Sequence, residues 1–306
     1  MKTRLITGII YVAILIAFFC LKFFVPVVGN VPIGDFCFDV LIYAFALIGT
    51  SEMFRALKDK MTKAERVLGW IFTIITIPVC ALCEWAFGNG LWAMGACIFL
   101  FALVLLCLLV VQHKDTTVES LGLSLLTAVY PTMMLGLLVL ANHLQADGET
   151  LEKFALDSRI VLLMIFVISP CSDTIAYVFG VCFRKWLPKK MAPELSPNKT
   201  VIGGVGGLVG GMLGASALYF LYNMPVGYGS YDQMYLWLPI YIAIGLLTSL
   251  ATMFGDLVES SLKRKLGIKD MGKLLPGHGG ILDRIDGTLF ATVIVYSIFA
   301  AIHMIL

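Results

Sequence analysis

The segment Leu275–Gly287, "LPGHGGILDRIDG", places a histidine, an arginine and two aspartates among glycines. Asp283 and Asp286 are three residues apart, so they lie on one face of the helix that follows. Pro276 and the glycines around His278 favour a tight loop over a regular helix. The backbone amides and imidazole of such a loop can meet an anion, and paired carboxylates can hold Mg²⁺. This pattern predicts a site for a polyphosphate with its metal ion.

The preceding segment, "FGDLVESSLKRKLGIKD", carries a polar stripe at helical spacing. Asp256, Glu259 and Lys263 recur three or four residues apart and form one face of a helix, with leucines opposite. An amphipathic helix at a membrane surface would also have such a face. The charge continues through Lys269 and Asp270 into the loop, however. Cations of this kind can neutralise phosphate charge that builds up in a transition state.

A third polar group lies in "VISPCSDTIAYVFG", an otherwise apolar stretch. Ser169, Asp173 and Tyr177 are spaced by four and share one helix face, and Pro170 is expected to kink or loosen the helix there. A carboxylate within an apolar helix is a functional candidate by default. The alternative is that Asp173 caps a neighbouring helix or pairs with a lysine of the next loop.

The segment "LSPNKTVIGGVGGLVGG" predicts a helix start that is suited to phosphate. Ser196 and Thr200 supply hydroxyls, Lys199 supplies a charge, and the helix N-terminus supplies free amides. The first glycines would let backbone approach a ligand. From Gly206 onward, close packing of neighbouring helices explains the glycines better.

The whole chain is too apolar for a soluble domain. Of its 306 residues, 59% are hydrophobic and 14% charged, with a mean hydropathy of +0.93. A helix crosses a bilayer with roughly 20 apolar residues. Nine stretches of this length are found, at about 5–28, 33–54, 67–87, 90–112, 119–143, 159–182, 201–222, 234–254 and 287–306. The fold is therefore predicted to be an all-α polytopic membrane protein.

Basic residues predict the orientation. With nine spans, 19 of the 22 lysines and arginines fall on the side of the N-terminus. The positive-inside rule then puts the N-terminus in the cytoplasm and the C-terminus outside. The polar loops 183–200 and 255–286 would both face the cytoplasm. The net charge of +2 follows this topology and gives no reason to expect nucleic acid binding.

The chain is interpreted as one membrane domain, 1–306, with an N-terminal helical scaffold at 1–145 and a catalytic half at 146–306. Two acids fall within apolar spans of the first half. Glu52 is expected to pair with nearby Arg55, and Asp39 to reach water at the outer end. His143, near a helix end, is expected to be interfacial.

The run Ser261–Asp286, "SLKRKLGIKDMGKLLPGHGGILDRID", closely resembles the C-terminal motif of the phosphatidate cytidylyltransferases, also called CDP-diacylglycerol synthases. It meets every fixed position of the family pattern, with Leu262 in the slot before Lys263. The resemblance extends to the pairs Gly255-Asp256, Glu259-Ser260, Asp173-Thr174, Ala176-Tyr177, Ser196-Pro197 and Lys199-Thr200 and to Gly180. One departure is visible, because Asn198 and Ile202 stand where the family has a lysine and a glutamate.

The resemblance implies an enzyme that joins CTP to phosphatidic acid and releases pyrophosphate. It implies a multi-pass protein of the cell (inner) membrane, with Mg²⁺ as cofactor, a second cation left open, and a homodimer. The implied metal ligands are Asp173, Asp256, Asp283 and Asp286. The implied catalytic residues are Asp256, Asp283, Asp286, Lys263, Arg264 and His278. The implied substrate contacts are Ser196, Lys199, Thr200, Lys269, Asp270, Gly277, Gly279, Gly280, Arg284, Asp173 and Tyr177.

Two other classes of function remain as alternatives. A CTP-dependent enzyme could act on a polyprenol or ether lipid, or transfer a phosphate as a lipid kinase. A membrane transporter would also carry intramembrane acids, but its polar groups would gather near mid-membrane. Here they gather at one face.

Overall fold

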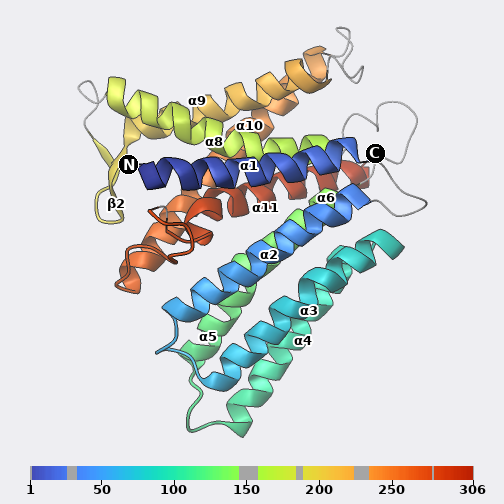
Figure 1. Cartoon of the computed structure of the whole chain (residues 1–306), viewed down its shortest axis with the longest axis vertical. Helices are drawn as coiled ribbons and strands as arrows, with labels where there is room; N and C mark the ends of the chain where they lie inside the picture. Colours follow the sequence, from blue (N-terminus) through green and yellow to red (C-terminus); the bar gives the residue numbers. More distant parts are fainter. Residues whose placement is uncertain are drawn as a thin grey trace. The chain divides into compact units, whose positions relative to one another are not determined.

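The computed structural model describes residues 2–25, 33–144, 158–183, 189–223, 234–277 and 279–305, and these residues are mainly helical (Figure 1). The first helices are α1 (Lys2–Phe24), α2 (Ile33–Ala56), α3 (Lys63–Phe87), α4 (Gly90–Val111), α5 (Val118–Thr127), the π-helical turn η1 (Ala128–Met133) and α6 (Met134–His143). The later elements are α8 (Ser158–Cys182), β1 (Lys190–Ala192), β2 (Ser196–Thr200), α9 (Val201–Leu218), the π-helical turn η2 (Tyr219–Asn223), α10 (Met234–Lys265) and α11 (Leu282–Ile305).

Within the described residues, nine helical stretches are long and apolar enough to cross a membrane. Their positions match the nine predicted spans, which confirms the prediction of a polytopic all-α membrane protein. Helix α10 continues past the expected end of the eighth span to Lys265. The predicted amphipathic helix is therefore the C-terminal part of α10. Helix α8 likewise continues through Pro170.

The chain divides into two compact units. The first unit comprises Met1–His143 and Leu266–Arg284, and the second comprises Leu144–Lys265 and Ile285–Leu306. The loop before α11 thus packs with the N-terminal helices. Helix α11 begins in the first unit, while most of its length belongs to the second.

In the first unit, polar side chains join the apolar helices. Thr50, Thr73 and Thr132 are fully buried and lie within hydrogen-bonding distance of one another, at 2.9 to 3.3 Å between hydroxyl oxygens. Such contacts between helices satisfy polar groups that lipid cannot hydrate. They tie α2, α3 and η1 together.

A second polar cluster of the first unit corrects the prediction for Asp39. Asp39 and His143 are both buried, and the His143 Nε2 atom lies 2.6 Å from the Asp39 carboxylate. Asn142 donates to the same carboxylate at 2.9 Å. The expectation that Asp39 reaches water is therefore wrong, because its carboxylate is satisfied inside the helix bundle. His143 is the last residue of α6 and of its apolar span, and its interfacial position stays a prediction. Lys22 and Asp35 form an ion pair beside them.

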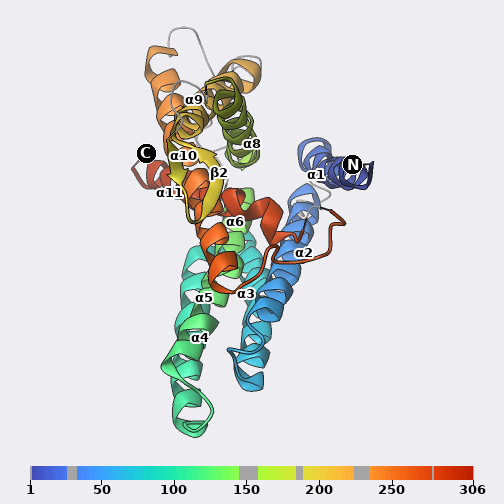
Figure 2. The ribbon, with the colours of Figure 1, turned by 90° about the vertical axis from the view of Figure 1, so that its left-hand side faces the viewer.

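In the second unit, α8, α9 and α10 lie side by side (Figure 2). The glycines of α9 explain this packing. A Cβ atom at Gly206 would lie 2.5 Å from Phe179 of α8, and one at Gly211 would lie 2.4 Å from Ser249 of α10. Larger residues would therefore force the helices apart, and the packing role predicted for these glycines is confirmed. Before α9, β1 and β2 form an antiparallel hairpin in which Lys190 pairs with Thr200.

Candidate active site

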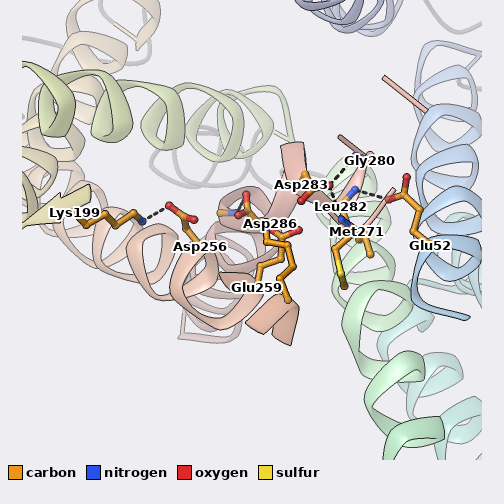
Figure 3. Close-up of polar contacts among 11 residues, drawn as sticks. Glu52, Lys199, Asp256, Glu259, Met271, Gly280, Leu282, Asp283 and Asp286 are labelled. Carbon is orange, nitrogen blue, oxygen red and sulfur yellow. Dashed lines mark hydrogen bonds and ion pairs between the residues drawn. The ribbon is translucent and has the colours of Figure 1, made fainter. Parts of the chain in front are cut away.

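The hairpin and the cap of α9 position Lys199. Thr200 is the N-cap of α9, and its hydroxyl accepts a hydrogen bond from the Gly203 amide at 3.1 Å. The predicted helix start at this position is therefore confirmed. Lys199, at the end of β2, forms an ion pair with Asp256 of α10 (Figure 3). Both side chains are partly exposed, so the pair is accessible to a ligand.

Three further carboxylates of the second unit lie close to this ion pair. Asp286 lies beside Glu259 (Figure 3), and Lys263 donates to Glu259 at 3.1 Å. Asp173 interacts electrostatically with Asp256, Asp286 and Lys199. Helices α8, α10 and α11 and strand β2 thus bring acids together with lysines. We call these residues the acid–lysine cluster: Asp173, Lys199, Asp256, Glu259, Lys263 and Asp286.

The loop of the first unit contains the predicted tight turn. Leu275 and Gly279 exchange two backbone hydrogen bonds, of 2.9 and 3.1 Å. Gly277 and Gly279 have φ angles of 82° and 87°, which residues with a side chain rarely adopt. His278, predicted to contact an anion, lies outside the described residues.

The tight turn borders a basic pocket of about 440 Å³. Its lining residues are Lys269, Asp270, Gly272, Lys273, Leu275, Pro276, Gly277, Gly279 and Arg284. A second pocket, of about 510 Å³, is lined by Arg55, Ala56 and residues 268–273. Two basic pockets thus share one stretch of loop. Their lysine and arginine side chains are suited to binding phosphates.

Two buried acids hold this loop in place. One oxygen of Asp283 accepts hydrogen bonds from the amides of Met271 and Gly280, at 2.9 and 2.8 Å. The two oxygens of Glu52 accept the amides of Ile281 and Leu282, at 3.0 Å each. The predicted Glu52–Arg55 ion pair is therefore wrong, because the start of α11 supplies the partners that the buried carboxylate needs.

The predicted site residues fall into the two units. The second unit holds Asp173, Lys199, Asp256, Lys263 and Asp286 in the acid–lysine cluster. The first unit holds Lys269, Asp270, Gly277, Gly279, Gly280, Asp283 and Arg284 in or beside its pockets. Of the remaining predicted residues, Tyr177 is 73% exposed, Arg264 is exposed at the end of α10, and Ser196 pairs with Ala192 in the hairpin.

Across the described ranges, no three acids, histidines or cysteines are close enough together to form a ready-made metal cage. Mg²⁺ commonly takes only one or two carboxylates from the protein and completes its shell with substrate phosphates and water. The Asp286–Glu259 contact is informative here. Two neighbouring carboxyl groups repel each other unless they share a proton or a cation. An all-oxygen pair of this kind suits a hard divalent ion.

The family comparison covers almost the entire chain. The family model described as "Cytidylyltransferase family" matches residues 2–302. The chain belongs to the cytidylyltransferase family.

Individual relatives agree with this assignment. The chain is 32% identical over 307 residues to the phosphatidate cytidylyltransferase of Bacillus subtilis (strain 168), and the aligned region covers 98% of both chains. It is 44% identical over 131 residues to the enzyme of that name from Staphylococcus aureus (strain COL), covering 42% of this chain and 45% of the relative. A Brucella abortus biovar 1 (strain 9-941) protein of the same name is 38% identical over 141 residues, covering 46% of this chain and 47% of the relative. The resemblance seen in the sequence is confirmed.

The sequence did not predict four residues that hold the loop or line its pockets. Glu52 and Arg55, from α2, contribute to the loop and its second pocket, and Gly272 and Lys273 line both pockets. One signal was available, because an acid inside an apolar span is a functional candidate. Its partners lie 229 and 230 residues away in the chain, so local spacing could not identify them.

Proposed function

We propose that this chain transfers the cytidylyl group of CTP to phosphatidic acid, giving CDP-diacylglycerol and pyrophosphate. The observation that carries the proposal is the match, over 98% of both chains, to a relative named phosphatidate cytidylyltransferase. The acid–lysine cluster and the basic pockets supply chemistry that this reaction requires. A phosphate oxygen of the lipid bonds to the α-phosphorus of CTP, and the bond from that phosphorus to the β-phosphate oxygen breaks. The electron pair leaves with pyrophosphate.

In this mechanism the protein supplies no nucleophile. Phosphoryl and nucleotidyl transfer depend mainly on alignment and on neutralising negative charge. Lys199 and Lys263 are both paired with acids and partly exposed, so each can turn from its carboxylate to a phosphate. Arg264 lies next to them at the end of α10. The loop cations Lys269, Lys273 and Arg284 line the basic pocket, where a second set of phosphate oxygens would bind.

Mg²⁺ fits the acids of the second unit. Asp256 and Asp286 would hold it, with Glu259 beside Asp286 and Asp173 close enough to influence the charge. Asp283, by contrast, has one oxygen engaged by two amides. When bound, the ion would offset charge on the leaving pyrophosphate. The chain's own task is to keep like-charged carboxylates together and to present lysines beside them. The proposal requires one Mg²⁺ ion and leaves the number of cations above one open to measurement.

The orientation and assembly belong to the proposal as well. The excess of lysine and arginine on one side supports an N-terminus in the cytoplasm, a C-terminus outside, and polar loops at the cytoplasmic face of the cell membrane, where CTP is present. A homodimer is proposed from the family resemblance alone. Single-cysteine labelling from either side of sealed vesicles tests the orientation: labelling of a cysteine at Lys58 from the outside would contradict it.

The activity is tested by incubating the purified protein with phosphatidic acid, Mg²⁺ and CTP labelled either at the α- or at the γ-phosphate. We expect the α-label in a lipid-soluble product and the γ-label in released pyrophosphate. A γ-label in lipid without cytidine would identify a lipid kinase instead. Parallel reactions with polyprenyl phosphate and an ether-linked phosphatidate analogue test the acceptor, and faster turnover of either would overturn the proposed substrate.

A further inference from the structure

Glu52 is a buried acid in α2, one of the N-terminal helices. It lies one turn before the end of α2, in an apolar span, and is only 2% exposed. Its two oxygens accept the amides of Ile281 and Leu282, at 3.0 Å each, where α11 begins (Figure 3). The first amides of a helix have no partner within the helix, and the helix dipole favours a negative charge there. The carboxylate is thus stabilised by the start of a helix that lies 230 residues further along the chain.

Two neighbouring glycines leave the space that this carboxylate occupies. A Cβ atom at Gly272 would lie 2.0 Å from a Glu52 oxygen, and one at Gly280 would lie 2.4 Å from both oxygens. Both glycines are buried and have no positive φ angle, so their backbone conformation alone does not demand glycine. Contact with the carboxylate explains why these positions have no side chain.

Glu52 and Asp283 divide the loop's amides between them. Asp283 takes Met271 and Gly280, and Glu52 takes the next two amides, Ile281 and Leu282. Three consecutive amides and one from the opposite side of the loop are therefore fixed by two acids. Gly272, beside Glu52, lines both basic pockets. The Glu52 carboxylate therefore lies directly against a residue that lines both pockets.

We infer that Glu52 is a positioning residue for the reaction, holding the loop Leu266–Ile281 and the first turn of α11 in the shape that binds substrate phosphate. The inference rests on the proposed function. It extends that function to the N-terminal helices, which supply the anchor of the phosphate-binding loop. Glu52 touches no reacting atom. It acts through the backbone of the pocket walls.

The test compares Glu52→Gln with the wild-type protein in the same detergent. Glutamine keeps one acceptor oxygen but loses the second and the charge. We expect kcat/KM for CTP to fall about 10- to 100-fold, since small misplacement of binding groups has effects of this size. We also expect faster hydrogen exchange at the amides of Ile281 and Leu282, which reports the two hydrogen bonds without requiring turnover.

The control is Glu65→Gln. Glu65 is also fully buried in the first unit and also takes two donors, the Thr62 amide and the Ser120 hydroxyl. It lies at the start of α3 and lines neither basic pocket. This variant should lose thermal stability to a similar degree and keep the wild-type kcat/KM in its folded fraction. A kinetic loss in Glu52→Gln alone would separate positioning from general destabilisation.

A double-mutant cycle gives an independent measure. Gly272→Ala places a methyl group where the Glu52 carboxylate lies, so it disturbs the same junction from the other side. Gly272→Ala combined with Glu52→Gln should therefore lose about as much kcat/KM as the more damaging single variant, because contacting sites are not additive. Gly122→Ala, where the added Cβ has no neighbour within 4 Å, should behave as the wild type.

Failure of the proposed function and failure of the positioning role give different results. If wild-type protein forms no CDP-lipid, the proposed function is wrong, whatever the exchange data show. If the wild type is active and Glu52→Gln keeps its kcat/KM while exchange at Ile281 and Leu282 accelerates, the positioning role is overturned. Strict additivity in the cycle with Gly272→Ala would overturn it too.

Discussion

In the first unit, Glu52 and Asp283 each accept hydrogen bonds from two backbone amides. In the second unit, Asp256 is paired with Lys199, and Asp286 lies beside Glu259 and accepts only one amide, that of Gly287. The difference has a chemical consequence. A carboxylate bound to amides keeps its partners throughout a reaction cycle, since the backbone cannot leave. A carboxylate bound to a lysine or to another acid can exchange that partner for a metal ion or a phosphate. We therefore assign structural support to the first pair and chemistry to the second.

The largest effect is expected for Asp286→Asn. The change keeps the shape and the acceptor for the Gly287 amide but removes a negative charge beside Glu259. We expect kcat to fall roughly 100- to 1000-fold, as when a preorganised electrostatic group is lost. Thermal stability should stay the same or rise, because two acids in contact repel each other. Turnover with saturating CTP, together with the melting midpoint in detergent, checks both expectations.

Asp256→Asn should lower kcat in the same way. Because the partner of Asp256 is the cation Lys199, losing this partly exposed ion pair should leave the thermal stability unchanged or slightly lower. The exposed acid Glu119, in the first turn of α5, provides a control, and Glu119→Gln should change neither quantity. If Asp286→Asn lowered the melting midpoint and left kcat intact, the assignment of chemistry to the second pair would be reversed.

Asp283→Asn sharpens the comparison. The asparagine oxygen can still accept the Met271 and Gly280 amides, but without the negative charge. Because a hydrogen bond to a charged group contributes about 1.5–3 kcal/mol, we expect a stability loss on the order of 1–2 kcal/mol. We expect the activity loss to be smaller than for Asp286→Asn, about 10- to 100-fold, because the loop is displaced while the acid–lysine cluster is intact. Chemical denaturation and CTP kinetics on one preparation measure both.

A full loss of Mg²⁺-dependent turnover in Asp283→Asn, without a change in stability, would instead place Asp283 among metal ligands. That result would show that an acid bound to the backbone can also take part in the chemistry, and the comparison between the units would fail.

The comparison also explains how far the sequence could predict this molecule. The nine spans were predictable because each is a continuous apolar run of the length that a bilayer requires. The turn at Leu275–Gly279 was predictable because proline and glycine restrict the backbone locally. The partners of Glu52 and Asp39 were not, since each lies more than 100 residues away. Contacts of that kind depend on how helices pack, which local spacing does not encode.

Lys199 should give a smaller effect than the carboxylates. Lys199→Ala removes one cation from a site that retains Lys263, so we expect kcat/KM for CTP to fall about tenfold, the effect of roughly 1.4 kcal/mol. Lys199→Arg keeps the charge and should recover part of the loss, although arginine presents its donors differently. Steady-state kinetics over a range of CTP concentrations check this order. Equal losses for alanine and arginine would mean that geometry at Lys199 matters more than charge.

The smallest effect is expected one residue later, at Thr200, where the hydroxyl is bound to the Gly203 amide at 3.1 Å. Thr200 was predicted to contact substrate, but its one hydroxyl oxygen is already bound to the backbone, so we expect it to stabilise the helix start and not to bind substrate. Thr200→Ala should therefore cost about 1 kcal/mol of stability, the usual effect of losing an N-cap, and leave KM for CTP unchanged. Thr200→Ser keeps the cap oxygen and should restore stability. An alanine variant of normal stability with a raised KM would mean that the hydroxyl binds substrate, and that even acceptors bound to amides can serve the reaction.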